Sequence, residues 1–245
     1  MTGKDDRLTD ILSNLESVTR RVETAARKVN RDPQQVKIVV VTKGQPLEVV
    51  RLAVEAGAAD LGENYPEQAV QKIESLAACT HLHWHMIGHL QSRKSDLVVR
   101  HFDYMHSLDS LSLAVRLDRL LALHDKKLPV LIEFNVGGKE SKHGWNVSHP
   151  SEWMSLLPDI DALRQLPYLE VRGLMTMPPY FEDPEKTRPF YVQMNRLRDF
   201  LANHFPSLEW KELSMGTSFD FEVAVEEGAS FIRLGQAILG PRPQK

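Results

Sequence analysis

The chain has 245 residues, of which 42% are hydrophobic and 26% charged, and its formal net charge is −3 at pH 7. This balance is typical of a soluble globular protein and argues against a broad nucleic-acid-binding surface. No apolar run approaches membrane-spanning length, no secretory signal is present, and the single cysteine, Cys79, excludes an internal disulfide, so we expect a cytoplasmic protein.

The first predicted element is an amphipathic helix over residues 5–30. Its apolar residues recur at helical spacing and form one stripe: Leu8, Ile11, Leu12, Leu15, Val18, Val22, Ala25 and Val29. Such a stripe must pack on the body of the protein. The segment 31–33 ends with a proline and is predicted to end the helix.

Strand-like and helical patterns then alternate to the end of the chain. The predicted strands are 36–43, 59–64, 82–89, 104–109, 130–137, 169–177, 210–216 and 230–235. Alternation of this kind indicates parallel strands with right-handed crossovers, and eight such units predict a single α/β domain over 1–245, a (β/α)8 TIM-type barrel with an added N-terminal helix. A doubly wound open sheet is the alternative, but its Gly-rich turn after the first strand is absent.

The chemistry of such barrels lies at the carboxyl ends of the strands. The first predicted strand ends in Lys43, and a lysine withdrawn from water becomes a neutral amine that forms Schiff bases with aldehydes. The alternative is a lysine whose ammonium simply extends from the strand end to solvent.

A second candidate lies after the seventh predicted strand, in the sequence LSMGTSFDFEVAVEEG at 213–228. Ser214, Thr217 and Ser218 surround a glycine before a predicted helix, an arrangement that binds phosphate or merely caps the helix. Arg233 lies inside the eighth predicted strand on the same face as Gly235, and a buried arginine needs an acceptor, either a ligand or a carboxylate such as Glu133.

Histidines gather in the third predicted strand, at His81, His83, His85 and His89. A His-x-His pair at a barrel strand end is typical of zinc hydrolases, but the other strand ends offer only Asp109 as a further ligand. We therefore expect no metal, and a barrel-facing His85 that contacts a ligand or bonds within the core. Together, a lysine amine, an arginine and a phosphate cradle fit pyridoxal 5′-phosphate (PLP), an aldehyde with a phosphate and a ring nitrogen.

The sequence resembles the pyridoxal phosphate homeostasis protein family, whose fold is that of the barrel domain of alanine racemase. The motifs that carry the resemblance are VVTK, GENY, WHMIGHLQSRK, SKHGW, GLMTM, LSMGTSFDFEVAVEEG and IRLGQAILG, in this order along the whole chain. The resemblance implies that Lys43 forms the internal aldimine with PLP and that Arg233 faces the pyridine nitrogen. The other implied PLP contacts are Asn64, His85, Lys142, Met175, Ser214, Met215, Thr217, Ser218, Gly235 and Gln236.

Two positions depart from the family pattern. Gln45 stands where many relatives have a second lysine, which puts any transfer role of that lysine in question. Thr217 stands where relatives often have methionine, and its hydroxyl is compatible with a phosphate contact.

An arginine at the ring nitrogen can only donate a hydrogen bond, which weakens the electron sink that PLP enzymes use. We therefore expect no catalytic residues and no turnover. The predicted function is that of a cofactor carrier in PLP homeostasis, which hands PLP to apo-enzymes and binds neither nucleic acid nor membrane. Because the chain ends soon after its eighth strand, without the second domain of alanine racemase, we expect a monomer. The alternatives are a PLP-dependent racemase or lyase of this fold, a cofactor-free lysine aldolase and, more distantly, a metal-dependent hydrolase.

Overall fold

Eight parallel strands close into a barrel in the computed structural model, which describes residues 2–139 and 143–241. The strands are β1 (Lys37–Val41), β2 (Asp60–Glu63), β3 (His83–Met86), β4 (Tyr104–Leu108), β5 (Leu128–Asn135), β7 (Leu169–Thr176), β8 (Glu212–Ser214) and β9 (Phe231–Leu234). Parallel pairing of β1 with β9 and of β4 with β5 closes the ring. The barrel prediction is confirmed, and each predicted strand is present at nearly its expected position.

One strand was not predicted. The two residues of β6 (Trp145–Asn146) pair in parallel with the end of β5 and lie outside the closed ring. A two-residue strand carries no alternation that a sequence pattern can reveal.

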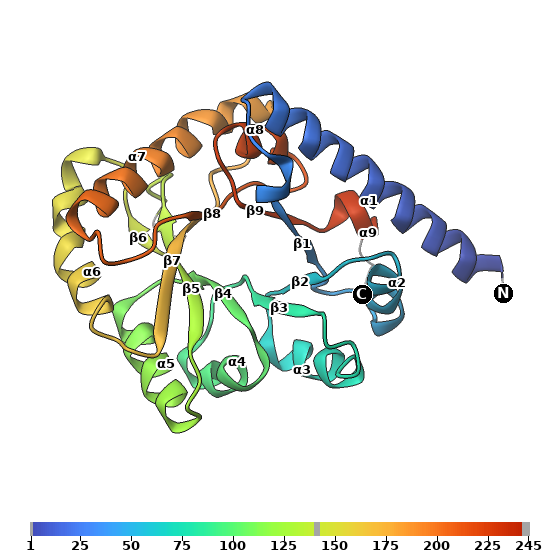
Figure 1. Cartoon of the computed structure of the whole chain (residues 1–245), viewed down its shortest axis with the longest axis horizontal. Helices are drawn as coiled ribbons and strands as arrows, with labels where there is room; N and C mark the ends of the chain where they lie inside the picture. The colour runs from blue at the N-terminus through green and yellow to red at the C-terminus, as the bar shows by residue number, and fades with distance from the viewer. Residues whose placement is uncertain (1, 140–142, 242–245) are drawn as a thin grey trace.

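Helices surround the strands (Figure 1). They are α1 (Thr2–Lys28), α2 (Leu47–Glu55), α3 (Pro66–Ser75), α4 (Ser95–His101), α5 (Leu111–Leu123), α6 (Leu157–Leu163), α7 (Arg188–His204), α8 (Phe221–Glu226) and α9 (Gln236–Leu239), with short 3₁₀ helices at Pro33–Gln35, Ser92–Lys94, Pro150–Leu156 and Pro184–Thr187. Among the described residues, no helix combines the length and apolar character needed to span a membrane.

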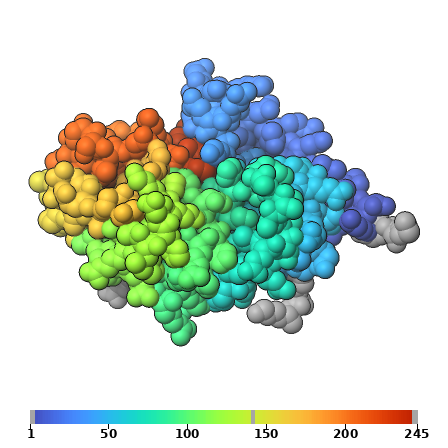
Figure 2. All heavy atoms as spheres, turned by 60° about the horizontal axis from the view of Figure 1, so that its bottom comes forward, coloured from blue at the N-terminus to red at the C-terminus, as the bar shows by residue number. Residues whose placement is uncertain are grey.

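The N-terminal helix is present as predicted, and α1 packs against α2, α8 and α9. Ile11, Val18 and Val22 on its apolar stripe are buried in the main core, and Arg21 on its polar side pairs with Glu222 of α8. Figures 1 and 2 show α1 along the outside of the body, with its N-terminal end projecting beyond it.

Two apolar cores follow from the alternation of side chains along the strands. The larger core lies between the strands and the surrounding helices. A small second cluster fills the barrel interior and consists of Val39, Leu131, Met175 and Phe231, with Tyr104 packed against it. Since the strands are all parallel, their carboxyl ends meet at one rim of the barrel, where the predicted site residues gather.

Candidate functional site

A cavity of about 250 Å³ opens at the carboxyl ends of the strands. Its lining residues are Val41, Lys43, Asn64, Ile87, Met177, Thr217, Ser218, Phe219, Arg233, Gly235 and Gln236. The volume is just below the roughly 300–1,000 Å³ of pockets for drug-sized ligands, so it suits a ligand with a single small ring. The fold brings seven residues that were predicted from the sequence to the lining of this one cavity: Lys43, Asn64, Thr217, Ser218, Arg233, Gly235 and Gln236.

Lys43 follows β1 in a turn that is held from behind. The N–H of Thr42 donates to the carbonyl of Gly62, and its hydroxyl donates to Glu63 at 2.7 Å. The ammonium of Lys72 donates to the same Glu63 carboxylate at 2.6 Å and to the Thr42 carbonyl at 2.9 Å. These buried contacts fix the backbone on which the half-buried Lys43 side chain enters the cavity.

Asn64 brings an unsatisfied polar atom to the cavity. Its Oδ1 is buried and has no hydrogen-bond partner among the described residues. The side chain is held closely by Gly88, because a Cβ at residue 88 would lie 2.7 Å from the Cα, Cβ and Nδ2 of Asn64. A buried amide oxygen without a partner is costly, so this atom is suited to a ligand that supplies one.

The predicted phosphate loop follows β8 and turns at Gly216. This residue has φ +90°, and a Cβ here would lie 2.7 Å from the Ala224 Cβ, so only glycine fits. Asp220 holds the loop, since its Oδ1 accepts from the N–H of Thr217 at 2.7 Å and from its hydroxyl at 2.9 Å. The N–H of Ala237 donates to Ser218 Oγ at 3.2 Å, which joins this loop to the first turn of α9.

Arg233 is 5% exposed and points from β9 into the cavity wall. It donates from NH1 to Ser214 Oγ and from NH2 to the Thr176 carbonyl at 2.9 Å, so both acceptors are uncharged. Burial lowers the pKa of Arg233, while the charges of Tyr191, Glu133 and Asp220 act in the opposite direction. A guanidinium nevertheless stays protonated and presents its remaining donors.

Four of the residues predicted to contact PLP do not line the cavity. Met175 faces the apolar barrel interior, and Met215 faces the core between strands and helices. Ser214 is fully buried beneath Arg233, and His85 lies deeper in the barrel, bonded to His106 and Asp60. Lys142 lies outside the described residues.

A further cluster lies nearby at the rim. His89 Nδ1 is 2.6 Å and His143 Nδ1 is 3.9 Å from Asp109 Oδ2, and the two rings stack with centroids 3.6 Å apart and planes inclined by 5°. Stacked rings direct their in-plane lone pairs along parallel lines, so a common metal ion would require one ring to turn.

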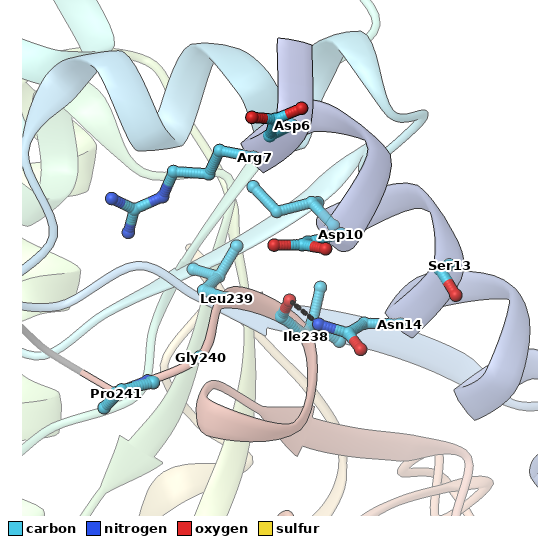
Figure 3. Close-up of a pocket in the computed structure, with 10 residues that line it drawn as sticks. Asp6, Arg7, Asp10, Ser13, Asn14, Ile238, Leu239, Gly240 and Pro241 are labelled. Carbon is cyan, nitrogen blue, oxygen red and sulfur yellow. Dashed lines mark hydrogen bonds between the residues drawn. The ribbon is translucent and has the colours of Figure 1, made fainter. Parts of the chain in front are cut away.

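The larger hollow of the molecule contains no predicted site residue. It measures about 730 Å³ and lies between the first turns of α1 and the segment around α9 (Figure 3). Asn14 Nδ2 bridges its two sides by donating to the Ile238 carbonyl at 3.0 Å. Its charged groups, Asp6, Arg7 and Asp10, belong to a helix surface, so the barrel cavity is the better candidate.

Sequence reasoning missed the residues that support the site from behind. Asp60, His106 and Asp220 were not singled out. The one available signal was a polar residue at a barrel-facing position, such as His106 two residues after Tyr104.

Comparison with known proteins agrees with this fold. Residues 13–243 match the family model described as alanine racemase, N-terminal domain. An alanine racemase of Clostridium difficile is similar in fold alone, with 15% identity and a TM-score of 0.69 over 98% of this chain and 61% of that one. The chain is therefore a barrel of the alanine racemase N-terminal class.

Closer relatives specify the family. The chain is 35% identical over 235 residues to the pyridoxal phosphate homeostasis protein of Vibrio cholerae, covering 95% of this chain and 96% of the relative. It is 36% identical over 228 residues to that of Aquifex aeolicus, covering 93% and 96%. PipY of Synechococcus elongatus, solved with PLP bound, has 32% identity and a TM-score of 0.79 over 94% of this chain and all of that one. The chain belongs to the pyridoxal phosphate homeostasis protein family, as its motifs predicted.

Proposed function

We propose that this chain binds PLP at the barrel cavity, holds it as a Schiff base on Lys43 and releases it to apo-enzymes. The observation that carries the proposal is that one small cavity joins a lysine amine, a buried guanidinium and a hydroxyl-rich loop. PLP supplies an aldehyde for the first, a ring nitrogen for the second and a phosphate for the third.

The residues present fit this cofactor. Ser218, with the turn at Gly235 and Gln236, offers hydroxyl and backbone N–H groups suited to a phosphate, while the two donors of Thr217 are bonded to Asp220 and fix the loop. The unsatisfied oxygen of Asn64 offers a further polar contact at the same cavity. The PLP bound by the Synechococcus relative supports the same assignment.

The cavity lining favours a carrier over a catalyst. Of the described residues that line it, only Lys43 and Arg233 are ionisable. Racemisation or elimination needs a second group that moves a proton on the other side of the substrate. Arg233 stays protonated and donates, so it cannot protonate the ring nitrogen, and its role is to bind and orient.

The experiment is an absorption spectrum of the protein with added PLP, before and after borohydride reduction. We expect a yellow complex that bleaches and retains PLP on Lys43, located by peptide mass. Lys43→Ala should retain no covalent PLP, whereas Lys127→Ala, which removes an exposed lysine before β5, should behave as the parent protein. Covalent PLP on other lysines but not on Lys43 would overturn the assignment.

Delivery needs its own measurement. The PLP-loaded protein is mixed with an apo-aminotransferase, and recovery of aminotransferase activity is followed over time. Recovery with no racemisation of free amino acids is the expected outcome. Steady turnover of an amino acid by the protein alone would identify a racemase or lyase instead.

A further inference from the structure

A row of buried polar side chains crosses the barrel interior from the cavity to its opposite end. Arg233 NH1 donates to Ser214 Oγ, and Ser214 Oγ lies 2.8 Å from His106 Nδ1. His106 Nε2 lies 2.9 Å from His85 Nδ1, and His85 Nε2 lies 2.8 Å from Asp60 Oδ1. Ser214 and His106 have no exposed surface, and His85 is 2% exposed.

With both histidines neutral, the chemistry of the two ends sets the direction of every bond between them. Arg233 can only donate, and the ionised carboxylate of Asp60 can only accept. Ser214 therefore accepts from Arg233 and donates to His106 Nδ1, so His106 carries its proton on Nε2. His106 then donates to His85 Nδ1, and His85 donates from Nε2 to Asp60. One arrangement satisfies all four contacts, with both histidines neutral.

The electrostatic environment agrees with this arrangement. Burial, and then the charge of Arg233, hold the pKa of His106 well below its usual value. Burial alone would raise the pKa of Asp60, but the hydrogen bond from His85 and the charges of Lys37 and His83 lower it. Asp60 is therefore ionised and His106 neutral at neutral pH.

Packing alone does not explain these side chains. The interior of such barrels is usually filled by branched apolar residues, and a buried polar group is costly unless it is bonded. The three inner members, Ser214, His106 and His85, each have a partner on both sides, which is the condition under which a buried polar network orders its members.

We propose that Asp60, His85, His106 and Ser214 form a positioning relay that holds Arg233 toward the cavity. The relay rests on the proposed function, in which Arg233 meets the ring nitrogen of PLP. It extends the cofactor site to the carboxylate of Asp60 at the far end of the barrel. Asp60 does not line the cavity, and no sequence pattern marks it as a cofactor contact.

The first test needs no cofactor. Long-range ¹H–¹⁵N NMR of the histidine-labelled protein reports which ring nitrogen carries the proton, and the signals are assigned with His85→Gln and His106→Gln. We expect Nε2–H at both positions. Nδ1–H at His106 would mean that the bonds run in the reverse direction, and would overturn the relay.

The second test separates the relay from packing. Asp60→Ala removes the terminal acceptor, so His106 should lose its single tautomer, the absorption maximum of bound PLP should shift, and the dissociation constant for PLP should rise about tenfold. Asp60→Asn keeps an acceptor oxygen and should restore most of each effect. Glu212→Gln weakens the hydrogen bond from Tyr104, whose ring packs against His85 and His106, but removes no hydrogen bond of the relay, so it is the control for packing.

The outcomes distinguish the two proposals. If Asp60→Ala leaves the His106 tautomer and PLP binding as in the parent, the relay is wrong even when Lys43 binds PLP. If the tautomers follow Asp60 but Lys43 takes up no PLP, the hydrogen-bonded relay stands and the proposed function fails. Should Asp60→Ala not fold, the tautomers of the parent protein and of Asp60→Asn still test the relay.

Discussion

The ammonium of Lys72 lies 2.6 Å from the carboxylate of Glu63, and the two side chains are 10% and 0% exposed. This pair lies behind the turn that carries Lys43, because Lys72 also donates to the Thr42 carbonyl. The second carboxylate oxygen of Glu63, Oε2, has no hydrogen-bond partner among the described residues. The buried negative charge of Glu63 is therefore compensated mainly by Lys72.

Lys72→Met should therefore lower the free energy of unfolding by about 3–5 kcal/mol, since it leaves a buried carboxylate without its cation. Urea unfolding followed by circular dichroism measures this. The double variant Glu63→Leu/Lys72→Met removes both charges and should recover most of the loss. Equal destabilisation in the single and double variants would show that the charge pair is not the cause.

Asp220 is expected to control the phosphate loop through its two hydrogen bonds to Thr217. Asp220→Ala should free the loop and raise the dissociation constant for PLP about tenfold, the equivalent of one charge-assisted hydrogen bond. Asp220→Asn keeps one acceptor oxygen and should have a smaller effect. Fluorescence titration with PLP measures both.

Tyr191, which bonds the other oxygen of the Asp220 carboxylate, provides a control. Tyr191 donates to Asp220 Oδ2 at 2.6 Å and lies away from the cavity lining. Tyr191→Phe should lower the free energy of unfolding by about 1 kcal/mol and change PLP affinity less than Asp220→Ala does. A larger loss of PLP affinity in Tyr191→Phe than in Asp220→Ala would show that the bonds from Asp220 to Thr217 do not control the loop.

An exposed aromatic pair stands at the cavity mouth. The rings of Tyr180 and Phe219 meet edge to face with centroids 5.4 Å apart, although the residues are 69% and 58% exposed. Because Phe219 lines the cavity, we expect Tyr180→Ala to loosen this cover and speed PLP release several-fold, at an interaction cost of about 1 kcal/mol.

Stopped-flow transfer of PLP to an excess of apo-enzyme measures the release rate. Leu123→Ala, which removes a 79% exposed apolar side chain from the end of α5, is the matched surface control. An unchanged rate in Tyr180→Ala would exclude the aromatic pair as a barrier to release.

His106 predicts a specific loss of stability in acid. In the folded protein its pKa lies well below 6.5, whereas the unfolded chain takes up a proton near the usual value of 6.5. Below that pH the unfolded state binds more protons, so stability falls as pH falls, by up to about 1.4 kcal/mol per pH unit for this one group. The loss ends once the pH reaches the folded-state pKa.

The free energy of unfolding of His106→Gln should fall less steeply than that of the parent protein as the pH drops below 6.5. Urea unfolding at a series of pH values measures the slope, and the histidines that do not contact His106 contribute equally to both proteins. Identical slopes would show that His106 is not the group responsible.

Most of the barrel can be read from the sequence because local patterns carry it. Runs of β-branched residues such as those from Val36 to Val41 alternate with helical stripes, and eight repetitions leave little choice of fold. The site residues Lys43, Asn64 and Arg233 could be predicted because parallel strands bring their carboxyl ends to one rim, wherever the residues lie along the chain.

How far a side chain lies below that rim depends on contacts between segments that are distant in the sequence. Ser214 and Arg233 both belong to the barrel face of their strands, yet Ser214 lies beneath Arg233 because its register partner in β9 is Phe231, two residues before Arg233. The bonds from His85 to Asp60 and His106 join residues of different strands that are 25 and 21 positions apart in the chain. Local sequence thus specifies which residues can do chemistry, whereas strand register and close packing select which of them meet the cavity and which support it from within, since hydrogen bonds and steric fit act over only a few ångströms.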